Sequence, residues 1–200
     1  MSSPLLWYAT RATGIVALVL LTATTVLGIL TANRVATRSW PGFAQQDLHR
    51  RVSMTAMVFL AAHVVTAVMD TFVHIGWAAV VVPFASSYKR FWVAVGAVGL
   101  DLLLAVFVTS IVRHRVPARL WRAVHWLAYG SWPVALAHAF GMGTDMGTSW
   151  VMYLSVGCIV AVLGAATWRL ALDRSRRQRT LAYPSVRNRP EGIPVKHLSA

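Results

Sequence analysis

Five stretches of this sequence are apolar over the length that a membrane-spanning helix requires. They cover residues 5–30, 48–69, 91–112, 120–140 and 149–170. An α-helix needs about 20 residues to cross a hydrocarbon core of ~30 Å, because it rises ~1.5 Å per residue. Lipid offers the backbone no hydrogen-bond partners, so each stretch is expected to satisfy its own backbone as a helix. The sequence therefore predicts an all-α integral membrane bundle of about five transmembrane helices.

Composition supports the membrane class and argues against a soluble domain. Hydrophobic residues make up 57% of the chain and charged residues only 12%, whereas a soluble domain carries about 25% charged residues. The formal net charge is +13, but the arginines lie at the ends of the apolar stretches. This placement favours membrane topology over nucleic-acid binding. We expect a lipid bilayer around the chain and no nucleic acid partner.

Three further segments complete the expected organisation. The stretch 72–84 is apolar but short, and is predicted to be an interfacial or re-entrant piece. The first apolar run has no basic residues before it and is longer than the core of a signal peptide, so we expect a retained helix. Residues 1–170 are expected to form one membrane domain. Residues 171–200 are expected to form a disordered basic tail. Its positive charges would set the orientation of the chain in the membrane, or would bind anionic lipid or a cytoplasmic reductase.

The positive charges also predict an orientation, because cytoplasmic flanks of membrane helices are rich in Lys and Arg. With five spans, the loops 31–47 and 113–119 lie on the same side as the tail. Apart from the tail, that side carries Arg34, Arg38, Arg50, Arg51, Arg113, Arg115, Arg119 and Arg122. The other side carries Arg11, Lys89 and Arg90. The expectation is a multi-pass protein of a bacterial cell membrane, with the N-terminus outside and the C-terminus inside.

Two of the predicted spans carry two histidines each. His49 and His63 lie on the second span, and His125 and His138 lie on the fourth. Both spans run outward, so His49 and His125 share a depth near the inner face, and the other two lie toward the outer face. The fourteen residues between His49 and His63 correspond to about 21 Å of helix. Imidazole pairs of this kind hold haem iron, so the sequence predicts an inner haem on His49 and His125 and an outer haem on His63 and His138.

The spacing fits one helix better than the other. On an ideal helix His49 and His63 point within about 40° of each other, but His125 and His138 point about 140° apart. A kink or local rewinding near Gly130, which precedes a proline in the same span, is therefore expected. Two other interpretations stay open, namely polar packing or a proton relay, and a different metal. A shared zinc or copper site is disfavoured by the ~21 Å separation. A weak repeat supports the pairing, because aspartates follow the two outer histidines at the same interval, as Asp70 and Asp145.

Four arginines and one aspartate are candidates for roles around the haems. Arg50, Arg51 and Arg122 are predicted to meet the carboxylates of the inner haem, because guanidinium matches carboxylate geometry. Arg11 is predicted to meet a carboxylate of the outer haem. All four also fit the simpler role of membrane anchors. Asp101 lies in the middle of the third span, where an ionisable group is costly. It would orient a ligand histidine, pair with an arginine, or remain protonated.

These histidines resemble those of the ferric reductase-like transmembrane domain. That family includes the membrane part of NADPH oxidases, eukaryotic ferric reductases, and the haem-binding subunit of the periplasmic methionine sulfoxide reductase system. The resemblance rests on H-x13-H and H-x12-H in the two spans, and on DLHRRVSM, RAVHWLAYGSWPVALAH and the following GTD, which are similar to small actinobacterial members. It covers roughly residues 5–170. It implies electron transfer from a cytoplasmic-side donor, through the inner and then the outer haem b, to an acceptor outside.

The resemblance also suggests partners. Larger members add a flavin- and nicotinamide-binding domain, whereas no GxGxxG or similar phosphate-binding loop occurs in this sequence. We therefore expect this chain to bind no flavin itself and to take electrons from a cytoplasmic flavoprotein or a membrane quinol. The expected acceptor is ferric iron, an extracytoplasmic FMN-binding protein or a partner reductase, and no catalytic residue is assigned. A haem-handling membrane protein and a haem-free membrane anchor for a redox partner remain as alternatives.

Overall fold

The computed structural model describes residues 4–32, 41–70, 73, 75–143 and 149–182. All regular secondary structure among these residues is helical. The elements, in order, are α1 (Pro4–Ala32), α2 (Gly42–Met69), α3 (Ala78–Val81), α4 (Arg90–Ile111), a 3₁₀ turn (Arg113–Arg115), α5 (Ala118–His125), α6 (Leu127–Met142) and α7 (Ser149–Ala182). The predicted all-α class is confirmed.

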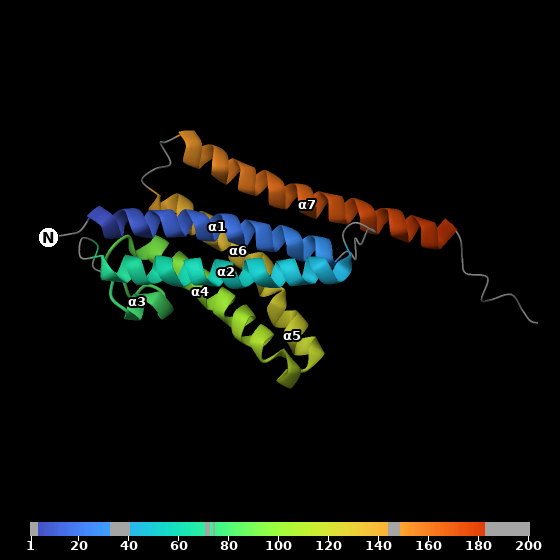
Figure 1. Cartoon of the computed structure of the whole chain (residues 1–200), viewed down its shortest axis with the longest axis horizontal. Helices are drawn as coiled ribbons and strands as arrows, with labels where there is room; N and C mark the ends of the chain where they lie inside the picture. Colours follow the sequence, from blue (N-terminus) through green and yellow to red (C-terminus); the bar gives the residue numbers. More distant parts are fainter. Residues whose placement is uncertain (1–3, 33–40, 71–72, 74, 144–148, 183–200) are drawn as a thin grey trace, which may run out of the picture.

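The long helices alternate in direction along the chain (Figure 1). α1 and α2 form an antiparallel pair, α4 packs against α6, and α1 also touches α6. α7 packs mainly on α1. Because α2 and α6 run in the same direction, the start of α2 lies at the same end of the bundle as α5. The end of α2 lies at the same end as the end of α6.

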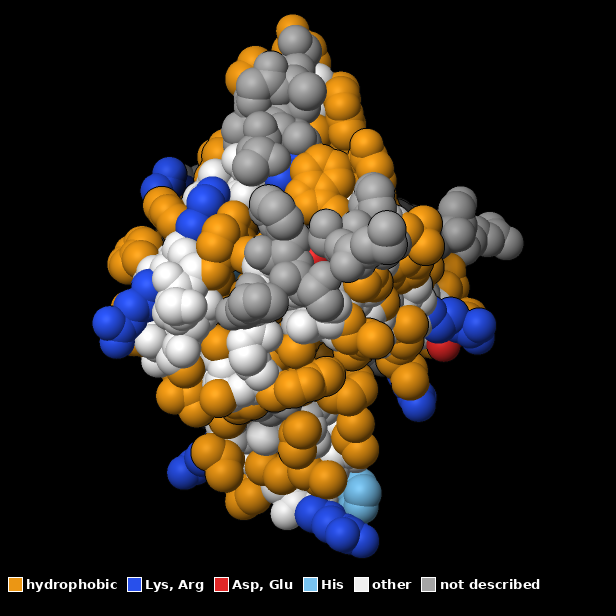
Figure 2. Space-filling model, turned by 90° about the vertical axis from the view of Figure 1, so that its left-hand side faces the viewer, with side chains coloured by type: hydrophobic (Ala, Val, Ile, Leu, Met, Phe, Trp, Pro, Cys, Tyr) orange, Lys and Arg blue, Asp and Glu red, His pale blue; other side chains and the backbone are white. Residues whose placement is uncertain are grey.

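Four of the helices, α1, α2, α4 and α7, are long and apolar enough to cross a membrane. Their outward faces carry large apolar side chains in contact with the surroundings, for example Val58, Val108 and Leu163. Hydrophobic side chains cover much of the end-on surface in Figure 2, with Lys and Arg around its periphery. Exposed apolar area on this scale is not tolerated in water but is required in lipid. The chain is a multi-pass membrane protein.

The predicted fourth span is divided into two helices, in line with the rewinding expected within it. α5 ends at His125 and α6 begins at Leu127. At the break the Tyr129 N–H donates to the Trp126 carbonyl over 3.1 Å, a three-residue turn in place of the four-residue turn of an α-helix. The sixteen residues of α6 rise only about 24 Å, so α6 alone is shorter than a spanning helix.

The break also lies earlier than predicted. Pro133 lies inside α6, and the helix continues through Gly130. The change in winding instead occurs at Trp126, directly after the first histidine of this segment. Arg169 of α7 lies with its guanidinium carbon 5.7 Å from the centre of a Trp126 ring, which ties α7 to the break. A rewinding between the two histidines was the expected feature, and it is present at a different residue.

Two peripheral segments also bear on the predictions. The first part of the tail that was expected to be disordered, residues 171–182, is helical and continues α7 to Ala182. Residues 183–200 lie outside the described residues, as do Asp145 and His74. Within the stretch 72–84 the ordered element is the four-residue helix α3, which packs on α4.

A buried hydrogen bond between side chains joins α6 to α1. The Trp132 indole N–H donates to the Thr22 hydroxyl over 2.9 Å, and that hydroxyl donates to the Leu18 carbonyl over 2.8 Å. Both side chains are buried, and Ser131 beside the tryptophan is fully buried. Small residues such as serine let membrane helices approach closely. This contact lies between the two histidine levels and holds α6 against α1.

We predict that Thr22→Val lowers the free energy of unfolding by about 1–2 kcal/mol, because it leaves the Trp132 N–H buried without an acceptor. Thermal unfolding in detergent micelles would measure the change. Thr167→Val is the matched control, since the Thr167 hydroxyl is exposed and bonds only the Gly164 carbonyl of its own helix. Equal melting temperatures for the two variants would contradict the role given to the Thr22–Trp132 bond.

Candidate functional site

One large cavity runs through the middle of the bundle. Its volume is about 1510 Å³, and its walls come mainly from α1, α2, α4 and α6. All four predicted histidines line it: His49, His63, His125 and His138. Pockets for a single small ligand usually measure about 300–1000 Å³. The cavity is therefore large enough for more than one cofactor.

The four histidines meet as two pairs, as the sequence predicted. The ring centres of His49 and His125 are 6.4 Å apart, with 65° between the ring planes. The ring centres of His63 and His138 are also 6.4 Å apart, with 81° between the planes. Two metal–imidazole bonds of about 2 Å, plus about 1 Å from each ring centre to its nitrogen, require about 6 Å between ring centres. Each pair therefore leaves the space that one iron atom needs between two imidazoles.

The donor set fits haem better than a metal ion held by protein alone. Within the described part of the chain, no three His, Cys, Asp or Glu side chains gather closely enough to hold a metal ion. A structural zinc site takes four protein ligands and a catalytic one takes three. In haem the porphyrin supplies the equatorial nitrogens, so that two axial imidazoles complete the coordination. The residues present fit this group.

The outer pair is oriented by the backbone of neighbouring helices. His63 Nδ1 lies 2.8 Å from the Thr10 carbonyl oxygen of α1, and His138 Nδ1 lies 2.8 Å from the Trp92 carbonyl oxygen of α4. A carbonyl oxygen only accepts, so each Nδ1 carries the proton and donates it. The lone pair is then on Nε2, the tautomer that binds a metal. A backbone carbonyl on the second nitrogen is typical of metal-ligating histidine.

The inner pair has different surroundings. Nδ1 of His49 and Nδ1 of His125 are buried, and neither has a hydrogen-bond partner among the described residues. The backbone of Thr24 faces His49, but the contact does not meet the geometry of a hydrogen bond. The His125 ring instead stacks on Trp121, with ring centres 4.8 Å apart and 24° between the planes. The inner imidazoles therefore lack the backbone acceptors that fix the tautomer of the outer pair.

Basic and aromatic side chains lie beside the inner pair. The Arg113 guanidinium carbon is 4.4 Å from the centre of the Trp121 ring. A smaller pocket of about 190 Å³ is lined by both of these residues and by Arg122. The indole N–H of Trp121 is buried without an acceptor among the described residues. Neither Arg113 nor Trp121 was predicted as a site residue. Trp121 could have been found from its position one helical turn before His125.

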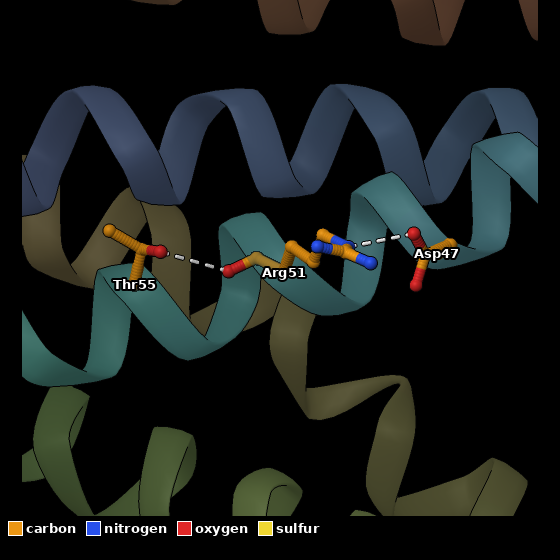
Figure 3. A network of polar contacts seen from close by, with 3 residues as sticks. All are labelled: Asp47, Arg51 and Thr55. Atoms are coloured by element: carbon orange, nitrogen blue, oxygen red, sulfur yellow. Dashed lines mark hydrogen bonds and ion pairs between the residues drawn. The ribbon is translucent and has the colours of Figure 1, made fainter.

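The four predicted arginines divide into two groups. Arg11, Arg50 and Arg122 line the cavity. Arg51 does not, because its Nε donates to Asp47 Oδ2 over 2.7 Å on an exposed surface of α2 (Figure 3). An exposed pair of this kind contributes little to stability. A carboxylate bound in the cavity would therefore lie near Arg50 rather than near Arg51.

The two aspartates are placed differently from one another. Asp70 is buried and lines the cavity at the end of α2. Asp101 is half-buried in the middle of α4 and is not part of the cavity wall. The second nitrogens of the outer histidines already face backbone carbonyls. Orientation of an outer ligand by Asp101 therefore has no support in this geometry.

Comparison with known families identifies the family of the chain. The family model described as "Ferric reductase like transmembrane component" matches residues 13–136. The chain belongs to this family. The match includes His49, His63 and His125 and ends just before His138, which joins the site through its geometry alone. No curated protein and no solved structure shows significant similarity to the chain. Membership implies transmembrane electron transfer in general terms, and the family typically binds haem b.

We predict different effects for two neighbouring arginines. If haem occupies the cavity, Arg50→Gln should lower the midpoint potential of the nearer haem by roughly 20–60 mV, because it removes a positive charge that favours the reduced state. Arg51→Gln should leave both potentials unchanged, since that side chain faces Asp47 at the surface. Potentiometric titration of the purified protein would measure both. Equal shifts in the two variants would contradict the placement of Arg50 at the cofactor.

Proposed function

We propose that this protein carries electrons across the membrane through two haem b groups, each held by one of the two histidine pairs. The observation that carries the proposal is the repeated geometry. The same ring separation of 6.4 Å occurs twice in one cavity. The two levels are separated by fourteen residues of α2, or about 21 Å, so the pairs lie toward opposite ends of the bundle.

In this proposal His49 and His125 hold the inner haem, and His63 and His138 hold the outer haem. Bound haem supplies a one-electron carrier. With two histidines committed to the cofactor at each level, neither site would keep an open position for O₂ or another small ligand. This supports electron transfer over chemistry at the iron. Two separate histidine pairs at two levels also support it over transient haem handling, for which a single site would suffice.

The chain's own residues would fix the cofactors in other ways. Arg50, Arg113 and Arg122 line the cavity at the inner level, where they are suited to bind haem carboxylates. Arg11 lines the cavity on α1, one residue after the carbonyl that accepts from His63, and would serve the outer haem. The remaining wall is mostly apolar, as suits the porphyrin ring.

We further propose an orientation and a direction for this transfer. Arg113, Arg115, Arg119 and Arg122 gather at the inner end of the bundle, which supports a cytoplasmic location for that end. The N-terminus would then be outside and the basic C-terminal end inside a bacterial cell membrane. Electrons would enter at the inner haem from a cytoplasmic flavoprotein or a membrane quinol. They would leave at the outer haem to ferric iron, an FMN-binding protein or a partner reductase.

A reduced-minus-oxidised absorption spectrum tests the cofactor assignment. We predict low-spin b-type bands and about two haems per chain. His63→Ala should lose the outer haem and His125→Ala the inner one, each leaving about half of the haem, because each change removes one axial ligand. The haem that remains in His63→Ala should differ in spectrum or midpoint potential from the haem that remains in His125→Ala. A colourless wild-type protein would leave only a membrane anchor and would remove the proposed redox function.

Cysteine labelling tests the orientation. The single natural cysteine, Cys158, is buried, so we expect it to react little with the label. Ser87 and Arg115 are exposed at opposite ends of α4. We predict that Ser87→Cys reacts with a membrane-impermeant maleimide in intact cells, and that Arg115→Cys reacts only after permeabilisation. The opposite pattern would reverse the proposed orientation.

A further inference from the structure

Three of the four histidine rings lie against glycines of a neighbouring helix. A Cβ built on Gly14 would stand 2.8 Å from His63 Nδ1. A Cβ built on Gly96 would stand 2.5 Å from both His138 Nδ1 and Cε1. Real Cβ atoms essentially never come this close to another heavy atom, so an alanine at either position requires the imidazole to move.

The same glycines have a fixed relation to the hydrogen bonds of the outer pair. The carbonyl that accepts from His63 belongs to Thr10, four residues before Gly14, and the carbonyl that accepts from His138 belongs to Trp92, four residues before Gly96. In an α-helix the carbonyl of residue i accepts the N–H of residue i+4. The carbonyl oxygen that accepts the hydrogen bond from the imidazole therefore lies beside the glycine.

Other residues of this chain show that a side chain at position i+4 covers that oxygen. The Thr22 hydroxyl donates to the Leu18 carbonyl, and the Thr66 hydroxyl donates to the Ala62 carbonyl, each four residues back. A Cβ at this position therefore stands next to the carbonyl and supports an atom that reaches it. An imidazole from another helix can occupy the same place only where position i+4 carries no side chain.

The spacing along α1 repeats this relation at the inner level. Gly28 follows Gly14 by fourteen residues, and His49 precedes His63 by the same interval on the antiparallel helix α2. A Cβ on Gly28 would stand 3.4 Å from His49 Cε1, an ordinary contact distance. The inner glycine therefore faces its histidine in the same register but with more room.

We propose that Gly14 and Gly96 are positioning residues that set where the outer haem ligands stand, by leaving a helix carbonyl open to each imidazole. The proposal rests on the proposed haem function. Gly28 has the same role in a weaker form. His125 is positioned differently, by stacking on Trp121. The outer haem therefore depends on glycine at two positions, whereas the inner haem tolerates a methyl group at its one glycine.

Alanine substitution with measured haem content tests the proposal. Gly14→Ala and Gly96→Ala should each lose the outer haem and so about half of the total, while the inner haem keeps its low-spin bands. Gly28→Ala should keep both haems. Gly130→Ala and Gly164→Ala are matched controls, because a Cβ at these helical glycines meets no atom within 4 Å. They should keep both haems. The proposal is overturned if Gly14→Ala and Gly96→Ala keep both haems with wild-type spectra, or if Gly28→Ala loses more haem than they do.

A second comparison separates loss of positioning from a general folding defect. In a His63→Ala background the ring that meets Gly14 is gone, so adding Gly14→Ala should leave the melting temperature and the yield unchanged. In the wild-type background the same substitution should lower the melting temperature. Equal losses in both backgrounds would show that Gly14 serves helix packing alone and would overturn the proposal. This comparison uses no haem readout, so it remains informative if the wild-type protein proves colourless and the proposed function fails.

Discussion

The contact between an imidazole and the backbone of the next helix is the interaction on which the rest of this structure depends. His63 reaches the Thr10 carbonyl, and His138 reaches the Trp92 carbonyl. In each bond Nδ1–H donates to the carbonyl oxygen, which leaves the lone pair of Nε2 for a metal. The two bonds also join α1 to α2 and α4 to α6, the two helix pairs with the most extensive contacts among the described residues. The tautomer and the ring position of each outer histidine therefore follow from one contact.

The break at Trp126 solves a problem of geometry. Thirteen residues of ideal helix would turn His125 and His138 about 140° apart, so a straight helix would present only one of them to α2. The short turn between α5 and α6 changes the rotation between them, and both rings meet their partners at the same distance. Its cost is that α6 is shorter than a spanning helix. Arg169 of α7 contacts Trp126 at this break.

Much of the candidate site could be predicted because the relevant signals are local. Two histidines on each of two apolar stretches, at matched depths, predict which rings meet, and the structure brings those rings together. Side-chain direction was harder to predict. Arg50 and Arg51 are adjacent and equally basic, yet one lines the cavity and the other pairs with Asp47 at the surface. The hydrogen-bond partners of Nδ1 could not be predicted. Every residue has a backbone carbonyl, and the sequence does not indicate which of them an imidazole contacts.

The sequence by itself determined that this chain is a helical membrane protein with two histidines on each of two apolar stretches. Apolar length and the ~1.5 Å rise per residue require membrane-spanning helices in any arrangement. Only the tertiary structure decided where the fourth segment breaks, which arginines enter the cavity, and which glycines meet the imidazoles. These features depend on the rotation and approach of neighbouring helices, and contacts between distant parts of the chain set both. The matching interval of Gly14 to Gly28 and His49 to His63 was visible in the sequence, but it acquires meaning only once α1 and α2 lie side by side.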